Sequence, residues 1–475
     1  MRRLSRSCVV LAIAAVVGLP GCARQAYAPR PVDREAAAAA YETRNTDDPA
    51  LRKYLVAQGH PEADWPVREW TLDQLTLLAF FYRPELEVAR AQARAARAEV
   101  DVASQRSPLG ISPRIEHHSA REGPSDTPWS LGFELEIPLT GQSQRAALIE
   151  RAEAQAQAAE LQVGGRAWTV RSEVRARLLD LYAARQRAAS LEAELDQQRA
   201  AVALLERRLE AGYASVTDVD VARLRAAHTQ SDIAAARTSV ELATGGLAQA
   251  LGVPLTALRP LQLSFATFET LPQLPETNTL RRDALTNRVD LQTALLDFSV
   301  SDAKVKLQVA RQYPSFALRP GYLWDQGDNV WSIAVDLVLP SHLTHGPAIK
   351  AAEATREAAA QQVLARQQTV IGEVAARAAT YAQAREGAAQ AQAASRTQLA
   401  RSSQLQKQFD IGQSDRLELT LARGEALLVE RRRVDALVDA QRHLGALEDA
   451  TQIPLAGGPV RMPSASDAGD SGAAR

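Results

Sequence analysis

Alternating apolar and polar residues mark two short segments, each of which begins with a tryptophan. In residues 129–138 the apolar side chains are Trp129, Leu131, Phe133, Leu135 and Ile137, and residues 331–340 repeat the pattern. Alternation of this kind predicts β-strands with one apolar and one polar face. A half-buried strand of a soluble sheet and a lipid-facing barrel strand both produce it. Weaker alternation at 316–324 and 111–120 predicts a partner for each strand.

Two long stretches, 142–209 and 348–409, contain no proline and are rich in alanine, glutamine, arginine and glutamate. At ~1.5 Å per residue, each predicted helix spans roughly 90–100 Å. Within the first, a heptad pattern with one polar interruption predicts coiled-coil packing. Its positions are Leu181, Ala184, Ala188, Leu191, Leu195, Gln198, Val202, Leu205 and Leu209. A stripe this narrow requires packing partners along the whole helix.

The same order of elements occurs twice. Arg83-Pro84-Glu85-Leu86 recurs as Arg288-Val289-Asp290-Leu291, and Gly212 recurs as Gly412. Such ordered self-similarity indicates an internal duplication. Each half is predicted to contain a helix, two strands, a very long helix, a turn and a second helix. We place the first repeat at 71–255, a linker at 256–280 and the second repeat at 281–455.

The first residues have the pattern of a secretory signal, in which three arginines precede a short apolar run. The segment Leu19-Pro20-Gly21-Cys22 resembles a bacterial lipobox, which implies a signal peptide over 1–21 and a lipid anchor on Cys22. The alanine that follows Cys22 implies the outer membrane. We expect residues 22–70 to form a tether and residues 456–475 to be disordered.

Composition and missing motifs narrow the function. The chain has 55 Lys+Arg against 56 Asp+Glu and a net charge of −1, so no basic field is present to hold nucleic acid. No phosphate-binding loop and no zinc protease signature occur. His342 and His345 lie in a predicted linker without a cysteine or a carboxylate cluster, which favours a solvated linker over a metal site. The sequence predicts no enzyme, no cofactor and no metal.

No later segment has the ~18 apolar residues needed to span a bilayer as a helix. Four strands are too few to close a barrel, for which about eight are needed, and lipid tolerates no open strand edge. If the strands lie in a membrane, several copies of the chain must therefore combine them.

Residues 70–455 resemble the TolC-type outer-membrane efflux family. The resemblance rests on the duplicated plan, on the turn segments 209–218 and 409–418, and on the closing segments 247–254 and 444–454. It implies a mainly α fold with a small β part: a coiled-coil α-barrel joined to a transmembrane β-barrel with four strands per protomer. It also implies a homotrimer in outer-membrane lipid, whose partners are a periplasmic adaptor protein and an inner-membrane pump.

The turns that follow the long helices contain helix-capping residues. Gly212 and Gly412 are placed to end the long helices in a left-handed conformation. Ser215-x-x-Asp218 and Asp415-x-x-Glu418 read as capping boxes of the next helices. Capping explains these side chains without a channel.

The resemblance adds a second interpretation, in which acidic side chains of these turns surround a periplasmic aperture. Glu418 matches one such position of the family, and Asp415, Asp218 and Asp220 are neighbouring candidates. Carboxylates around a narrow pore attract cations and repel one another unless bases oppose them. Arg416 is the candidate counter-charge.

Trp129, Trp331 and Trp324 are candidates for a membrane-interface belt, where an amphipathic ring lies at headgroup depth. The sequence as a whole thus favours a passive outer-membrane channel component of a tripartite efflux or secretion system. The alternative is a periplasmic coiled-coil structural or adaptor lipoprotein without a channel. Adaptors have one helical hairpin flanked by soluble β-domains, whereas this sequence predicts two hairpins, each preceded by a strand pair.

Overall fold

A computed structural model describes residues 27–119, 127–139, 141–338, 342–456 and 463. It divides into two compact units, residues 1–44 and 45–475. In the first unit, helix α2 (Arg34–Glu42) begins at Asp33, whose side chain accepts a hydrogen bond from the amide of Ala36 at 3.0 Å. The predicted signal peptide and Cys22 lie outside the described residues.

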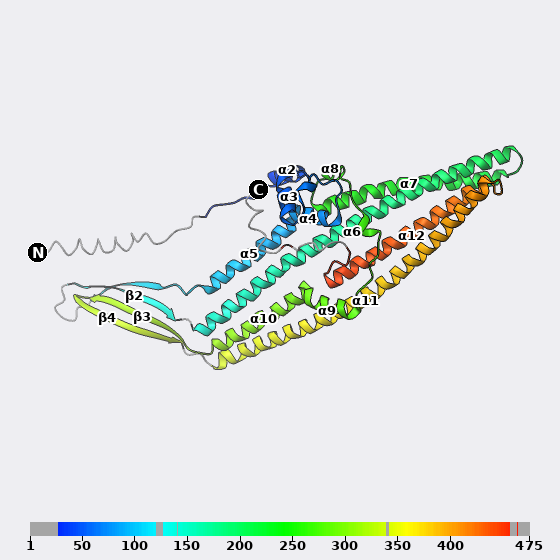
Figure 1. Ribbon diagram of the computed structural model, residues 1–475. Coiled ribbons are helices and arrows are strands. Elements are labelled where there is room, and N and C mark those ends of the chain that lie inside the picture. The colour runs from blue at the N-terminus through cyan, green and yellow to red at the C-terminus, as the bar shows by residue number, and fades with distance from the viewer. Residues whose placement is uncertain (1–26, 120–126, 140, 339–341, 457–462, 464–475) are drawn as a thin grey trace. The chain divides into compact units, whose positions relative to one another are not determined.

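The second unit is mainly helical, with one small sheet (Figure 1). Its main elements are α3 (Pro49–Ala57), α4 (Leu72–Tyr82), α5 (Pro84–Ser104), β1 (Gly110–His117), β2 (Trp129–Leu139), α6 (Gln142–Glu210), α7 (Val216–Leu251), α8 (Leu255–Leu258), α9 (Thr277–Asn287), α10 (Val289–Ala310), β3 (Ser315–Asp325), β4 (Asp328–Val338), α11 (His342–Asp410) and α12 (Arg416–Thr451). Two 3-10 turns, η1 (Glu62–Asp64) and η2 (Ala266–Phe268), complete the series. None of the described helices combines the length and the apolar composition needed to span a membrane.

The predicted duplication is visible in the helices. Both long helices, α6 and α11, contain 69 residues, and both following helices, α7 and α12, contain 36. At ~1.5 Å per residue, 69 residues extend over roughly 100 Å. The predicted start of the second long helix at Ala348 was wrong, because α11 begins at His342 and includes Pro347. Proline removes one helical hydrogen bond, and a helix of this length tolerates that loss near its beginning.

The four strands form one antiparallel sheet in the order β1-β2-β3-β4. The strand predicted to start at Trp331 starts three residues earlier, because a two-residue turn joins β3 to β4. Its central residues, Gln326 and Gly327, have φ values of 51° and 109°. Positive φ at both positions matches the twist of a tight hairpin and extends the pairing to Asp325 and Asp328. The weakly predicted strand at 111–120 is shorter, since β1 ends at His117.

The largest apolar core lies where α4 packs against the middle of α6 and the end of α7. Leu51, from the segment predicted to be a tether, is fully buried in it, as is Phe268 from η2. A second core joins α9, α11 and α12 around the buried ring of Tyr381. The Tyr381 hydroxyl donates to the carbonyl of Pro272 at 2.7 Å. Burial raises the pKa of this hydroxyl to about 12.

An arginine joins three helices in the same way in each repeat. Arg83 binds Glu85 at the start of α5, Glu173 in α6 at 2.9 Å and the carbonyl of Ala250 in α7 at 3.1 Å. Its guanidinium presents several donors in a fixed fork, which suits it to such a junction. The short predicted repeat that begins at Arg83 thus marks a junction between helices.

The second repeat forms the corresponding junction with Arg288. This arginine binds Asp290 at 2.7 Å, Glu373 in α11 at 2.5 Å and the carbonyl of Ala450 in α12 at 3.2 Å. Both arginine side chains are about nine-tenths buried. Arg83 thus connects α5, α6 and α7 in the first repeat. Arg288 connects α10, α11 and α12 at the matching positions of the second repeat.

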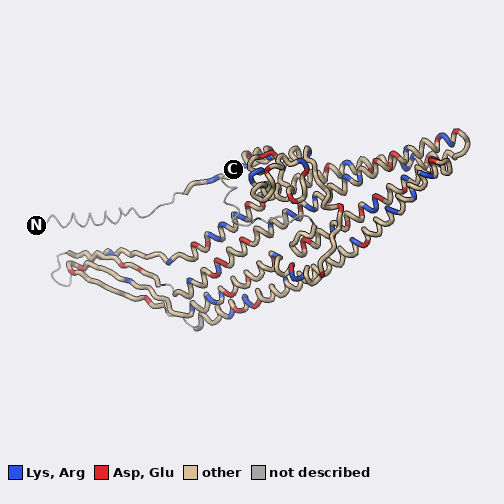
Figure 2. Tube along the Cα trace, viewed as in Figure 1, with Lys and Arg blue, Asp and Glu red and all other residues tan. Residues whose placement is uncertain are grey.

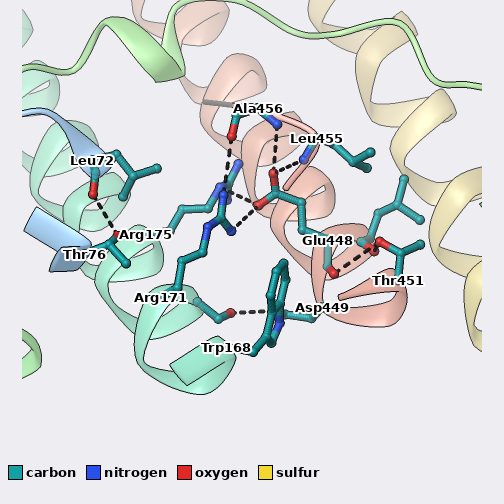
Figure 3. Close-up of polar contacts among 12 residues, drawn as sticks. Leu72, Thr76, Trp168, Arg171, Arg175, Glu448, Asp449, Thr451, Leu455 and Ala456 are labelled. Atoms are coloured by element: carbon teal, nitrogen blue, oxygen red, sulfur yellow. Dashed lines mark hydrogen bonds and ion pairs between the residues drawn. The ribbon is translucent and has the colours of Figure 1, made fainter. Parts of the chain in front are cut away.

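A buried polar cluster connects the repeats between α6 and α12 (Figure 3). Glu448 binds Arg171 and Arg175, each at 3.2 Å, and all three side chains are almost fully buried. Glu448 also accepts hydrogen bonds from the amides of Leu455 and Ala456. Burial lowers the pKa of Arg175, and the carboxylate of Glu448 opposes that shift. Removal of Glu448 would leave two buried guanidinium groups without their carboxylate.

Candidate functional site

One face of the sheet is apolar and uncovered. The register places Trp331 opposite Tyr322, Val335 opposite Leu318 and Leu337 opposite Phe316, so these side chains share one face. Ile333 and Trp331 are each 78% exposed. β2 to β4 each contain 11 residues, and about 9–11 residues suffice for a tilted strand to cross a bilayer. An apolar face of this extent left in water favours aggregation, so a membrane or a partner must cover it.

The three predicted interface tryptophans lie at one end of this apolar face. Trp129 begins β2, Trp324 is next to the end of β3, and Trp331 follows the start of β4. This is the end formed by the β3–β4 turn, away from the points where β2 and β4 lead into the long helices (Figure 1). The rings of Tyr322 and Trp331 lie 4.8 Å apart, and those of His117 and Trp129 lie 4.6 Å apart. The sheet therefore has an aromatic border at this end.

The opposite face of the sheet is polar and charged. Arg319 lies 2.7 Å from Asp336 and 3.4 Å from both Glu134 and Glu136. Three carboxylates around one guanidinium leave a net negative charge. Such a face suits contact with water and ions and is expensive to place in lipid.

Both outer strands of the sheet have an unpaired edge. β1 pairs only with β2, and β4 pairs only with β3, within the described residues. An unpaired edge exposes a row of backbone donors and acceptors to solvent or to another chain. In a bilayer these groups would need partners, and the described part of one chain supplies none for the outer edges of β1 and β4.

The turn between α6 and α7 forms the predicted caps. Gly212 has a φ of 77°, which a glycine adopts without strain. The amide of Asp218 donates to the Ser215 hydroxyl at 3.1 Å, and the amide of Ser215 donates to the Asp218 carboxylate at 3.0 Å. Hydrogen bonds from Ser215 lower the pKa of Asp218. The predicted capping box is confirmed. It holds the Asp218 carboxylate in hydrogen bonds to Ser215 of the same turn.

The turn between α11 and α12 has the predicted left-handed glycine, since Gly412 has a φ of 76°. The predicted capping box was wrong here, because Asp415 makes no side-chain cap hydrogen bond. Glu418 instead accepts a hydrogen bond from the Ser414 hydroxyl at 3.0 Å. The carboxylate of Asp415 can therefore bind a residue outside its own turn.

That contact connects the two helical tips. Arg208, in the last turn of α6, donates to the Asp415 carboxylate at the start of α12. Burial raises the pKa of Asp415, the hydrogen bond from Arg208 lowers it, and the net pKa is below its ordinary value. The predicted counter-charge was Arg416, whereas the structure brings Arg208 to Asp415. Asp220 lies 3.7 Å from Arg223 in its own helix, and Glu418 is exposed.

Three groups of functional side chains are absent from the sequence-based candidates. Arg319 with its carboxylates, Arg208 and the cluster around Glu448 all join segments that are distant in the chain. The alternation within β3 and β4 places Arg319 and Asp336 on the polar faces of their strands. The contact between these two residues could therefore have been predicted from the sequence. No local pattern links Arg208 to Asp415.

Residues 79–253 match a family model described as outer membrane efflux protein. The outer membrane protein VceC of Vibrio cholerae superimposes with a TM-score of 0.65 at 18% identity, covering 81% of this chain and 96% of VceC. The chain has the fold of the outer membrane efflux proteins. This finding confirms the predicted resemblance and the predicted mainly α fold with a small sheet.

Two further outer-membrane channels have the same fold. OprN superimposes with a TM-score of 0.64 at 20% identity, covering 92% of this chain and 99% of OprN. CmeC of Campylobacter jejuni gives a TM-score of 0.63 at 16% identity, covering 83% of this chain and 88% of CmeC. No curated protein matches the sequence. The fold is thus shared over most of the chain at low sequence identity.

Proposed function

We propose that three copies of this outer membrane efflux protein fold form one channel through the outer membrane, with a twelve-stranded barrel above a tunnel of long helices. The two-faced sheet with its two unpaired edges carries the proposal. An apolar face toward lipid and a charged face toward a water-filled interior is the pattern of a membrane barrel. Pairing of β4 of one copy with β1 of the next would remove every edge.

The long helices suit a conduit that continues into the periplasm. α10 packs against both α6 and α11 beside the sheet, the two long helices extend away from it, and α7 and α12 return from the tips (Figure 1). Acidic and basic residues are interspersed along these helices, as Figure 2 shows. The channel would be passive and would act in efflux or secretion with a periplasmic adaptor protein and an inner-membrane pump.

A pair of neighbouring substitutions tests the assignment of the two faces. Ile333→Lys places a charge on the proposed lipid face, where a lysine costs up to about 2–4 kcal/mol as its depth approaches the bilayer midplane. Ser332→Lys adds the same charge on the polar face. We expect Ile333→Lys to abolish heat-resistant trimers and conductance in planar bilayers, and Ser332→Lys to preserve both. Equal behaviour of the two variants would contradict the proposal.

We further propose that Glu418, Asp415, Asp218 and Asp220 surround the periplasmic aperture. All four are exposed and lie in the two turns or among the first five residues of the following helices. Exposed carboxylates around a narrow water-filled opening favour cations. Asp415 is paired with Arg208, and Asp220 lies 3.7 Å from Arg223. Glu418 and Asp218 are therefore expected to contribute most to the field.

Neutralisation of Glu418 tests this role in single-channel recordings. Glu418→Gln should lower the cation preference or change the conductance. Glu425→Gln removes the same charge from an exposed position two turns further along α12 and should change neither. Unchanged conductance and selectivity in Glu418→Gln would end the assignment.

The lipid anchor is proposed on Cys22. Metabolic labelling with radioactive palmitate should modify the natural chain and leave Cys22→Ser unlabelled. Label retained by Cys22→Ser would place the lipid elsewhere or exclude the anchor.

A further inference from the structure

A cavity of about 450 Å³ lies between α6, α10 and α11. Its volume is within the ~300–1,000 Å³ range of small-molecule sites. Three alanines of α11 leave the space open on one side, and Leu307 of α10 lies on the other. The remaining lining residues are polar: Arg151, Lys304, Gln308, Arg311 and Thr355.

The charge of this cavity has one sign. Its lining includes the cations Arg151, Lys304 and Arg311 and no carboxylate. Within the described part of the chain, none of these three forms an ion pair, whereas the nearby Lys306 binds Glu150 at 2.5 Å. Three uncompensated cations around a hollow repel one another. An anion in the hollow would remove that repulsion.

Helix capping accounts for only part of the cluster. Arg311 is the C-cap residue of α10, where a cation interacts favourably with the helix dipole. That interaction does not explain Lys304, two turns earlier in α10, or Arg151 in another helix. The three cations come together only because α6 and α11 pack on either side of α10.

We propose that this cavity binds a phosphate group. Three cations and two polar side chains offer the charge-assisted hydrogen bonds that phosphate oxygens accept. Arg311 precedes the first residue of β3 by only four positions. The phosphate could therefore belong to a lipid headgroup next to the sheet or to a soluble phosphate in the aqueous phase. The lipid source rests on the proposed membrane position of the sheet, and the soluble source does not.

The test compares full-length protein in detergent with two double variants. Lys304→Gln/Arg311→Gln removes two cations from the cavity. Arg94→Gln/Arg97→Gln removes two exposed cations from α5 as a matched control. Each protein is titrated calorimetrically with inorganic phosphate, and its retained phosphatidylglycerol is counted by native mass spectrometry. Lys304→Arg/Arg311→Lys keeps the charge and controls for altered folding.

We expect the cavity variant to bind at least about tenfold more weakly than the natural chain, while both control variants keep most of their affinity. Binding of inorganic phosphate would identify a soluble ligand, and retention of phosphatidylglycerol alone would identify a headgroup site. Equal binding by all variants, or no binding of either probe, would overturn the proposal. Channel conductance reports separately on the proposed function, because the cavity substitutions leave the sheet unchanged.

Discussion

The two repeats agree at the helix junctions and differ at the helical tips. Arg83 and Arg288 make the same set of contacts, including a carbonyl of the returning helix. At the tips, the Ser215 turn closes on itself, whereas Asp415 reaches the other hairpin through Arg208. The junction arginines are mostly buried, whereas both partners of the contact between the tips are exposed.

This difference separates the part of the molecule that holds its shape from the part that is able to rearrange. A hydrogen bond to a charged group such as a junction arginine contributes about 1.5–3 kcal/mol. An exposed pair contributes about 0–1 kcal/mol. The tips are therefore held together weakly enough for a partner or a change of charge to separate them, while the junctions stay fixed.

The largest expected effect is at the buried cluster between the repeats. Glu448→Ala leaves Arg171 and Arg175 without their carboxylate and should destabilise each chain by about 3–5 kcal/mol. Glu425→Ala, at an exposed position of the same helix, should cost under about 0.5 kcal/mol. Denaturant titration of the detergent-solubilised proteins measures both. Similar midpoints for the two variants would contradict the assigned importance of the cluster.

The two junction arginines should be equivalent. Arg83→Met and Arg288→Met each lose several charge-assisted hydrogen bonds, which predicts a destabilisation of about 2–3 kcal/mol per chain. Their denaturation midpoints should agree closely. A large loss in one variant and none in the other would show that the two repeats do not share this junction.

The two tips should respond differently to loss of their cap residues. Ser215→Ala removes the cap of α7 and should cost about 1 kcal/mol. Its amide hydrogen exchange should rise only at the start of α7. Asp415→Ala instead removes the contact with Arg208, so exchange should rise at the end of α6 as well as at the start of α12. Identical exchange patterns in both variants would remove the distinction between the tips.

The smallest effect concerns pH. Because the pKa of Asp415 in the folded chain is below its ordinary value of 3.8, the ionised carboxylate stabilises the folded tip above that value. This contribution is lost as the pH falls through the lowered pKa. Protection factors, which correct exchange for its intrinsic pH dependence, should stay constant near neutral pH at the start of α12 and fall only below about pH 4. Asp415→Asn should lack this loss of protection at low pH. A loss of protection near pH 6 would show that a group other than Asp415 is responsible.

The strands and long helices were predictable because their patterns are local. The alternation after Trp129 identified β2, and the proline-free run after Gln142 identified α6. The start of α11 was misplaced because a proline such as Pro347 usually signals a helix boundary. The one hydrogen bond that Pro347 removes is a small loss in a helix of this length. Local periodicity thus sufficed for the elements.

The contacts between distant segments were not predictable from those patterns. Asp415 fits a capping box by spacing, yet Arg208 from the other hairpin takes its carboxylate. No local pattern marks Arg171 and Arg175 as buried, yet the packing of α12 buries both against Glu448. Such roles depend on which helices become neighbours.

The mass of the detergent-solubilised complex tests the central claim most directly. An unpaired β1 edge and an unpaired β4 edge require further copies of the chain in lipid, so light scattering corrected for detergent should give a trimer from the membrane fraction. A monomer that remains soluble without detergent and never sediments with membranes would contradict the account.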